Sequence, residues 1–297
     1  MEAPSGKDFE QVAESIKIII PDFEERINAI RQKNGFIIDM DGVIYHGDTL
    51  LPYITEFIEW LETNNKKYLF LTNNSAPTPK ELQSKLQRLG LNIGIEHFYT
   101  SAIATARFLY HQTNGKGGKV YCVGEPGIQI ALYEKGFIID EIKPDYVVIG
   151  EGRTINFDTI THASRLVANG AKLIYTNPDA NCLVNGGIKP GCGAFNACIE
   201  MASGKKGFYV GKPSSLMMKY AQQILDVPEK ETCIIGDNMK TDVLAGVLAE
   251  IDPVLVLTGV TALNTLDDYA YSPFLILPGA GYLTLNIKTE NNTMSSI

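Results

Sequence analysis

The sequence has little cysteine, and its cysteines form no recognisable pattern. Its 297 residues include five cysteines, and no two of them make a C-x-x-C pair. An odd set without metal-ligand spacing argues against both a disulfide framework and a zinc site. We therefore expect reduced thiols that pack inside a cytoplasmic protein. They are Cys122, Cys182, Cys192, Cys198 and Cys233.

Long apolar runs and dense basic runs are also missing. The early apolar run IKIIIP is too short to span a bilayer, and the mixed-charge start lacks the apolar core of a signal peptide. The net charge is −8, from 26 basic and 34 acidic residues. We therefore expect neither a nucleic-acid polymer nor a membrane as partner. An anionic substrate would need positive charge supplied locally, by a metal, a lysine or backbone N–H groups.

The hydrophobic content and the pattern of apolar runs predict an α/β protein. Hydrophobic residues make up 45% of the chain, enough for a full core, and the length suggests two domains. Short runs rich in Val, Ile, Phe and Tyr alternate with helical patterns, which predicts a mainly parallel sheet covered on both faces. The expected strands are 36–38, 68–71, 119–123, 145–149, 172–176, 232–235, 254–257 and 273–277.

The helical patterns carry their own start and stop signals. In the segment 78–90, Thr78 is an N-cap, Pro79 takes the first helical position, Glu81 completes a capping box and Gly90 ends the helix. Further helices are expected at 127–136, 155–170 and 214–225, and one or two amphipathic helices at 7–33.

Polar residues follow four of the apolar runs, where parallel strands place their carboxyl ends and bind ligands. One run ends in Asp39, one in Thr72-Asn73-Asn74 and one in Asp237-Asn238, while Lys212 follows YVG. Each residue alone could be an ordinary cap or turn residue. The four together predict a single site at one edge of the sheet.

The chemistry of this site is indicated by Asp39 and Asp41. Side chains at i and i+2 of an extended chain point the same way, so both carboxylates can address one small substrate. Gly42 allows a sharp turn just beyond them. Carboxylates at strand ends suit a hard cation such as Mg²⁺, and an aspartate can accept a phosphoryl group covalently. The pattern therefore favours phosphoryl transfer.

Four segments in this order, DMDGVIYHG, LTNNS, GKPS and GDNMKTD, resemble the motifs of the haloacid dehalogenase (HAD) superfamily of phosphohydrolases. TNPD and NGGIKPGCGAF resemble its NagD-like subfamily, which includes p-nitrophenylphosphate, pyridoxal-phosphate and phosphoglycolate phosphatases. The resemblance covers about residues 35–285. It implies a Rossmann-like parallel-sheet core at 35–114 and 207–297, with an inserted α/β cap at 115–206. The segment 1–34 would be an N-terminal helical leader of unassigned role.

The resemblance also implies a role for each motif residue. Asp39 would attack phosphorus and become an aspartyl phosphate, and Asp41 would protonate the leaving oxygen and later deprotonate water. Lys212 would neutralise Asp39 and the transferring group. Mg²⁺ would bind the Asp39 side chain, the Asp41 main-chain carbonyl and Asp237. Phosphate would contact Thr72, Asn73 and Asn74. Asp242 and Asn238 would support the residues that hold the metal, without binding it themselves.

Cap and entrance residues are less constrained. Asn181, in the loop after TNPD, is either a substrate contact or an ordinary turn residue, and His46 either lines the entrance or is a plain loop histidine. The segment at 179–182 lacks the histidine of some pyridoxal-phosphate phosphatases, which argues against that substrate. His97, His111 and His162 are expected to be structural.

The expected substrates are small phosphate monoesters over a broad range, with nucleoside monophosphates favoured by family analogy. A more specific sugar-phosphate, phosphoglycolate or pyridoxal-phosphate phosphatase is the alternative. A receiver-type signalling module lacks the second acid and the cap, and a membrane-pump ATPase needs membrane spans. A mutase or phosphotransferase would share the first half-reaction. Because some relatives dimerise through the cap, a homodimer is also left open.

Overall fold

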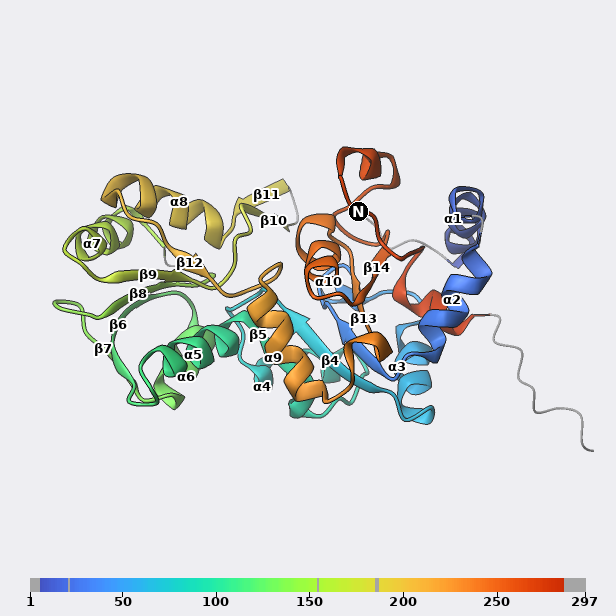
Figure 1. Ribbon diagram of the computed structural model, residues 1–297, viewed down its shortest axis with the longest axis horizontal. Coiled ribbons are helices and arrows are strands. Elements are labelled where there is room, and N and C mark those ends of the chain that lie inside the picture. The colour runs from blue at the N-terminus through green and yellow to red at the C-terminus, as the bar shows by residue number, and fades with distance from the viewer. Residues whose placement is uncertain (1–5, 21, 154, 185–186, 286–297) are drawn as a thin grey trace, which may run out of the picture.

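The computed structural model describes residues 6–20, 22–153, 155–184 and 187–285. Two parallel sheets lie side by side, each with helices packed against it (Figure 1). The strand order is β15-β14-β13-β1-β4-β5 in the first sheet and β12-β9-β8-β6-β7 in the second. The predicted α/β fold, with a parallel-sheet core and a further α/β unit, is confirmed. The predicted core segment 207–297 extends into 286–297 and the leader into 1–5, which lie outside the described residues.

Every predicted strand overlaps an observed one. The first sheet consists of β1 (Gly35–Ile38), β4 (Lys67–Thr72), β5 (Phe98–Thr100), β13 (Thr232–Gly236), β14 (Asp252–Val256) and β15 (Leu275–Leu277). The second consists of β6 (Gly118–Val123), β7 (Phe137–Ile139), β8 (Tyr146–Ile149), β9 (Lys172–Tyr175) and β12 (Phe208–Tyr209). Two antiparallel ribbons pair β2 (Tyr45–His46) with β3 (Thr49–Leu50), and β10 (Asn181–Val184) with β11 (Gly187–Pro190). The sequence analysis missed β5, β7, β12 and both ribbons, all of them four residues long or shorter.

The helices cover the sheets. They are α1 (Gly6–Ile19), α2 (Phe23–Gln32), α3 (Ile54–Thr63), α4 (Pro79–Arg88), α5 (Ser101–Gln112), α6 (Pro126–Glu134), α7 (Phe157–Ala168), α8 (Cys192–Ser203), α9 (Ser215–Leu225) and α10 (Leu244–Leu248). None of the helices in the described ranges is long and apolar enough to cross a membrane. All five cysteines are free thiols, as expected, but the prediction that they pack inside the protein is wrong for Cys198, which is exposed.

The N-terminal helices cover the outer edge of the first sheet. Ile16, Ile27 and Ile30 are buried in the cluster that also contains Leu275 and Leu277 of β15. Arg26 donates a hydrogen bond of 2.8 Å to the Phe274 carbonyl oxygen, and Arg31 donates one of 2.9 Å to that of Leu283. A covered edge cannot recruit a strand from another chain, so α1 and α2 protect this side of the sheet.

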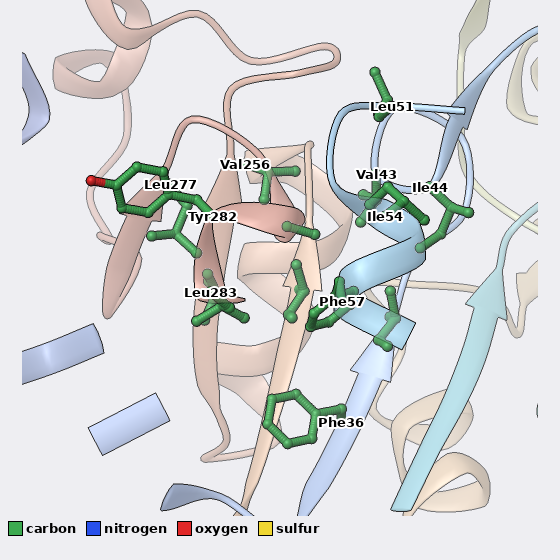
Figure 2. Close-up of a cluster of buried hydrophobic side chains, with 14 of the residues drawn as sticks. Phe36, Val43, Ile44, Leu51, Ile54, Phe57, Val256, Leu277, Tyr282 and Leu283 are labelled. Atoms are coloured by element: carbon green, nitrogen blue, oxygen red, sulfur yellow. The ribbon is translucent and has the colours of Figure 1, made fainter. Parts of the chain in front are cut away.

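A large apolar cluster covers one face of the first sheet (Figure 2). Phe36 comes from β1, Phe57 from α3, and Leu283 from the short helical turn Ala280–Thr284. All three side chains are completely buried. The cluster holds the end of β1 rigidly in place, and that end leads directly into Asp39.

Helix α5 lies between the two sheets. Ala106 and Leu109 of this helix are buried against Val120 of the second sheet and Ile128 of α6. Ala104 is buried in a different cluster, which contains residues of the first sheet. This helix therefore packs on both units, and its two faces join them through apolar contact.

Helix α4 begins with the predicted capping box. The Glu81 N–H donates to Thr78 Oγ1 at 3.2 Å, and the Thr78 N–H donates to Glu81 Oε2 at 2.8 Å. Gly90 follows the last turn with a φ of +96°, a conformation that strains residues with a side chain. The sequence signals at both ends of this helix are confirmed.

Thr78→Ala should lower the free energy of unfolding by about 1 kcal/mol, because the first turn of α4 loses its capping acceptor. Chemical denaturation followed by circular dichroism measures this change. Ser84→Ala, in the interior of the same helix, is the matched control and should be neutral or slightly stabilising. Equal stability of Thr78→Ala and wild type would show that the box contributes nothing.

Candidate active site

The site is built around the buried ammonium group of Lys212. Its Nζ lies 2.8 Å from Asp39 Oδ1 and 2.6 Å from Asp242 Oδ1, and the lysine is only 1% exposed. Asp39 extends β1 by one residue, since its N–H donates to the Ile235 carbonyl at 2.9 Å. One cation thus joins the end of the central strand to the segment that follows β13.

Lys212 is positioned by a reciprocal pair of hydrogen bonds. The Lys212 N–H donates to Asn73 Oδ1 at 2.7 Å, and Asn73 Nδ2 donates to the Lys212 carbonyl at 2.9 Å. Asn73 follows β4, the other neighbour of β1. Three adjacent strand ends therefore contribute to one arrangement, which is where the sequence analysis expected a site.

A third carboxylate completes a compact cluster. Oxygen atoms of Asp39, Asp237 and Asp242 all lie within 4.8 Å of one another. Three carboxylates against one ammonium leave two negative charges if all are ionised. Burial raises the pKa of Asp39 to about 7, the Asp242 charge adds to the rise, and Lys212 opposes it. Burial also raises the pKa of Asp237, with Asp242 and Asp39 adding to it. This oxygen-only, negatively charged set fits a hard divalent cation.

Two glycines leave room for Asp237. A β-carbon at Gly42, where φ is +77°, would lie 2.7 Å from Asp237 Oδ2, and one at Gly259 would overlap that atom. The Val260 N–H donates to the same oxygen at 2.7 Å. Position 42, in the turn after Asp41, thus requires glycine for two reasons: its backbone has a positive φ, and a side chain there would collide with the Asp237 carboxylate.

Asp41 lies apart from the three clustered carboxylates. Its side chain is exposed, yet the surrounding protein still desolvates the carboxyl and raises its pKa. Lys85 of α4, His46 of β2 and Lys189 of β11 oppose this rise. Cationic or basic groups from three separate segments therefore favour the charged form of Asp41. Its metal contact through the main-chain carbonyl stays a prediction.

The side chains after β4 mostly serve the local structure. Thr72 Oγ1 accepts from the Asn74 N–H at 3.1 Å, and Asn74 Oδ1 accepts from the Ala76 N–H at 3.0 Å. Asn73 uses its amide on Lys212, as described above. Phosphate binding by Thr72, Asn73 and Asn74 stays a prediction.

The remaining candidates occupy the margins of the site. Asn238 Oδ1 caps the helical turn Met239–Val243 by accepting from the Lys240 N–H at 2.9 Å, and its own N–H donates to Asp242 Oδ2 at 3.3 Å. His46 Nε2 hydrogen-bonds the Thr258 carbonyl. Asn181 is exposed at the start of β10. Contacts of Asn181 and His46 with substrate stay predictions.

The three isolated histidines have structural surroundings. His97 Nδ1 hydrogen-bonds the Tyr68 carbonyl at 2.9 Å, and His162 Nε2 that of Glu141 at 2.8 Å. The His111 ring lies 6.4 Å from that of Tyr220, between ring centres.

The sequence analysis missed a polar junction between the two sheets. Asn73 Nδ2 donates to Asp179 Oδ2 at 2.8 Å, and Asn177 Nδ2 donates to the same oxygen at 2.6 Å. Ser75 Oγ accepts from the Glu151 N–H at 2.7 Å. Glu151 and Asn177 follow β8 and β9, so the strand-end rule that located Asp39 would have found them in the second sheet too.

Comparison with known proteins connects this geometry to an enzyme family. A family model described as haloacid dehalogenase-like hydrolase matches residues 36–138, and one described as HAD-hydrolase-like matches 209–281. The chain is 40% identical over 242 residues to the ribonucleotide monophosphatase NagD of Escherichia coli strain K12, covering 82% of this chain and 94% of that protein. It is 39% identical over 239 residues to the dihydroxyacetone phosphatase of Corynebacterium glutamicum, covering 80% and 86%. The 4-nitrophenylphosphatase structure from Thermotoga maritima has a TM-score of 0.82 at 32% identity, covering 86% of this chain and 98% of that one.

Lys212→Met should destabilise the metal-free protein by about 3–5 kcal/mol at pH 8, because it leaves Asp39 and Asp242 buried without a cation. Burial raises the pKa of Asp39 and Lys212 opposes that rise, so loss of the lysine raises the folded-state pKa of Asp39 further above its unfolded value. Stability is then lost as pH rises above the unfolded value, so the deficit should be smaller at pH 5. Urea denaturation in chelator measures both. The exposed Lys219→Met is the control, expected within about 0.5 kcal/mol of wild type. Full stability of Lys212→Met at pH 8 would contradict the ion-pair argument.

Proposed function

This chain belongs to the haloacid dehalogenase-like hydrolases, and on that premise we propose that it cleaves small phosphate monoesters through a phosphoaspartate at Asp39. It is a phosphatase of small phosphate monoesters, as its named relatives are. The observation that carries the mechanism is the placement of Asp39 on Lys212, at 2.8 Å, beside two further carboxylates.

In the first step, a carboxylate oxygen of Asp39 attacks phosphorus as the bond to the ester oxygen breaks. Lys212, held in place by Asp242, offsets charge on Asp39 and on the transferring group. Asp41 donates its proton to the departing alcohol oxygen. Its raised pKa favours the protonated form that this task requires.

In the second step, water hydrolyses the phosphoaspartate. Asp41, now deprotonated, takes a proton from water as the water oxygen attacks phosphorus and the bond to Asp39 breaks. Inorganic phosphate leaves and the free carboxylate of Asp39 is restored. The two aspartates differ in surroundings: Asp39 is tied to Lys212, whereas Asp41 is exposed to an incoming water. That difference supports one acting as nucleophile and the other as proton carrier.

We propose Mg²⁺ as the cation, held by the side chains of Asp39 and Asp237 and the main-chain carbonyl of Asp41. When bound, it supplies positive charge to the site and to the oxygens of the phosphoryl group. Asp242 is committed to Lys212, and Asn238 holds Asp242 from its backbone, so both are assigned supporting roles. We assign Thr72, Asn73 and Asn74 to binding the phosphate group of the substrate.

The second sheet is proposed to act as a cap over the site. We place the cap at 115–206, between core segments 35–114 and 207–297 with the leader 1–34 in front. The strands β6 to β9 fall inside this cap, while β12 at 208–209 joins the same sheet. The substrate range is proposed to be broad and to include nucleoside monophosphates, in a cytoplasmic enzyme that is a candidate homodimer.

Asp39→Asn should abolish hydrolysis of p-nitrophenyl phosphate, because an amide cannot form the phosphoaspartate. Asp41→Asn should instead release about one p-nitrophenolate per active site in a burst and then turn over roughly 10²–10⁴-fold more slowly, since this leaving group needs no acid but dephosphorylation needs a base. Rapid-quench kinetics with Mg²⁺ measures both variants. Wild-type turnover in Asp39→Asn would refute the mechanism, and a missing burst in Asp41→Asn would refute the division of roles.

Mg²⁺ should raise the unfolding temperature of the wild type but not of Asp237→Asn. At a cation concentration a hundred times the dissociation constant, binding adds about 2.7 kcal/mol. Differential scanning fluorimetry, with and without Mg²⁺, measures the shift independently of activity. Asp268→Asn, an exposed aspartate in the core, is the matched control and should retain the full shift. An equal shift in Asp237→Asn would exclude this residue as a ligand.

A further inference from the structure

The loop after β14 contacts the turn that follows Asp41. Thr258 Oγ1 donates a hydrogen bond of 2.6 Å to the Gly42 carbonyl oxygen, and the threonine is only 6% exposed. In the sheet, β13 separates β14 from β1, the strand that leads into the turn. A buried hydroxyl group from a more distant strand end therefore binds the backbone next to Asp41. Local sequence patterns do not reveal this contact, because it joins positions that are 216 apart.

Gly42 is a position at which the backbone needs support from outside. Its φ of +77° and the Asp237 carboxylate beside it require glycine, the residue with the greatest backbone freedom. Two hydrogen bonds restrict that freedom. The Gly42 N–H donates to the Tyr45 carbonyl at 2.9 Å, which holds the peptide group that contains the Asp41 carbonyl. The Thr258 hydroxyl holds the next peptide group, so the backbone is fixed on both sides of Gly42.

Apolar packing holds the two segments that carry these groups. Val43 follows Gly42 and Val256 ends β14, and both side chains belong to the same buried cluster (Figure 2). His46 Nε2 hydrogen-bonds the Thr258 carbonyl, which adds a second polar contact between the two segments. The Thr258 hydroxyl therefore extends from an anchored backbone. Replacing it with a methyl group of similar size should release the Gly42 carbonyl while the loop stays in place.

The same loop holds Asp237 by different means. The Val260 N–H donates to Asp237 Oδ2 at 2.7 Å, and the Thr261 N–H donates to the Asp237 carbonyl at 3.1 Å. Both donors are backbone groups, which a side-chain substitution at Thr258 leaves in place. The contacts of the loop with the carboxylate cluster and its contact with the Asp41 turn can therefore be separated by mutation.

We propose that Thr258 is a positioning residue for Asp41, and that its hydrogen bond to Gly42 keeps the Asp41 carboxyl aligned with the leaving oxygen. The inference rests on the proposed function, because it takes Asp41 as the proton carrier. As the bond from phosphorus to the ester oxygen breaks, the proton passes from Asp41 to that oxygen, and this transfer requires close alignment of the two groups. Asp39 precedes the turn and is held by Lys212, so its attack on phosphorus does not need Thr258.

The test compares two esters of similar size whose alcohols differ in their need for an acid. p-Nitrophenolate leaves unprotonated, whereas the alcohol of 4-nitrobenzyl phosphate must receive a proton as it leaves. Thr258→Val should slow release of 4-nitrobenzyl alcohol roughly 10- to 100-fold and keep release of p-nitrophenolate within about twofold of wild type. Rapid-quench kinetics of a single turnover, with Mg²⁺ and enzyme in excess, measures both rates. The ratio of the two rates does not depend on the fraction of the variant that is folded.

Three further variants show whether the effect acts through Asp41. Thr258→Ser retains the hydroxyl group and should keep most of the wild-type ratio. Thr261→Val removes another buried hydroxyl group of the same loop, one that accepts from the Met239 N–H at 3.1 Å, and should leave the ratio unchanged. In the Asp41→Asn background, Thr258→Val should cause no further selective loss, because the proton donor that it positions is already gone.

An unchanged ratio in Thr258→Val, or an equal loss on both esters, would overturn the proposal. A full selective loss in Thr258→Ser or Thr261→Val would also overturn it, as would a further selective loss in the Asp41→Asn background. Failure of the wild type to hydrolyse p-nitrophenyl phosphate would overturn the proposed function instead.

Discussion

The contact of one buried ammonium with two carboxylates organises the structure. Lys212 Nζ lies 2.8 Å from Asp39 and 2.6 Å from Asp242, inside a site that excludes most water from the lysine. A charge in this position is stable only when it is paired, so the strand ends must converge on it. The ammonium offsets one of three clustered carboxylates. The negative charge that remains suits the cluster to a divalent cation and surrounds the Asp39 carboxylate.

The same lysine links the carboxylate cluster to the second sheet. Lys212 comes three residues after β12, an edge strand of that sheet, and its backbone is held by Asn73 of the core. Asn73 also donates to Asp179, at the base of the β10–β11 hairpin. A displacement of the second sheet must therefore break or carry these hydrogen bonds. Lys212, the loop after β4 and the base of the β10–β11 hairpin share one polar junction, and apolar packing of α5 also joins the two sheets.

Sequence reasoning succeeded where the signal was local and strong. The buried strands were visible as apolar runs, and α4 was visible from Thr78, Glu81 and Gly90, because capping and periodicity involve residues close in the chain. The short edge strands β7 and β12 gave no such signal. Ile138 and Ile139 of β7 are exposed, so in this strand an apolar residue type does not indicate a buried position. Asn181 lies at the start of β10, in a hairpin that the sequence analysis did not predict.

The sequence by itself determined the α/β class, the strand ends that carry Asp39, Thr72, Lys212 and Asp237, and the family. Strand-end chemistry is local, and the spacing of Asp39 and Asp41 is set by the backbone. Only the tertiary structure decided which side chains meet. It placed Asp242 directly on Lys212, tied Asn73 to Asp179 and separated Asp41 from the clustered carboxylates. These contacts join residues from 30 to more than 100 positions apart, and they arise from how the two sheets pack, which residue types and local periodicity do not encode.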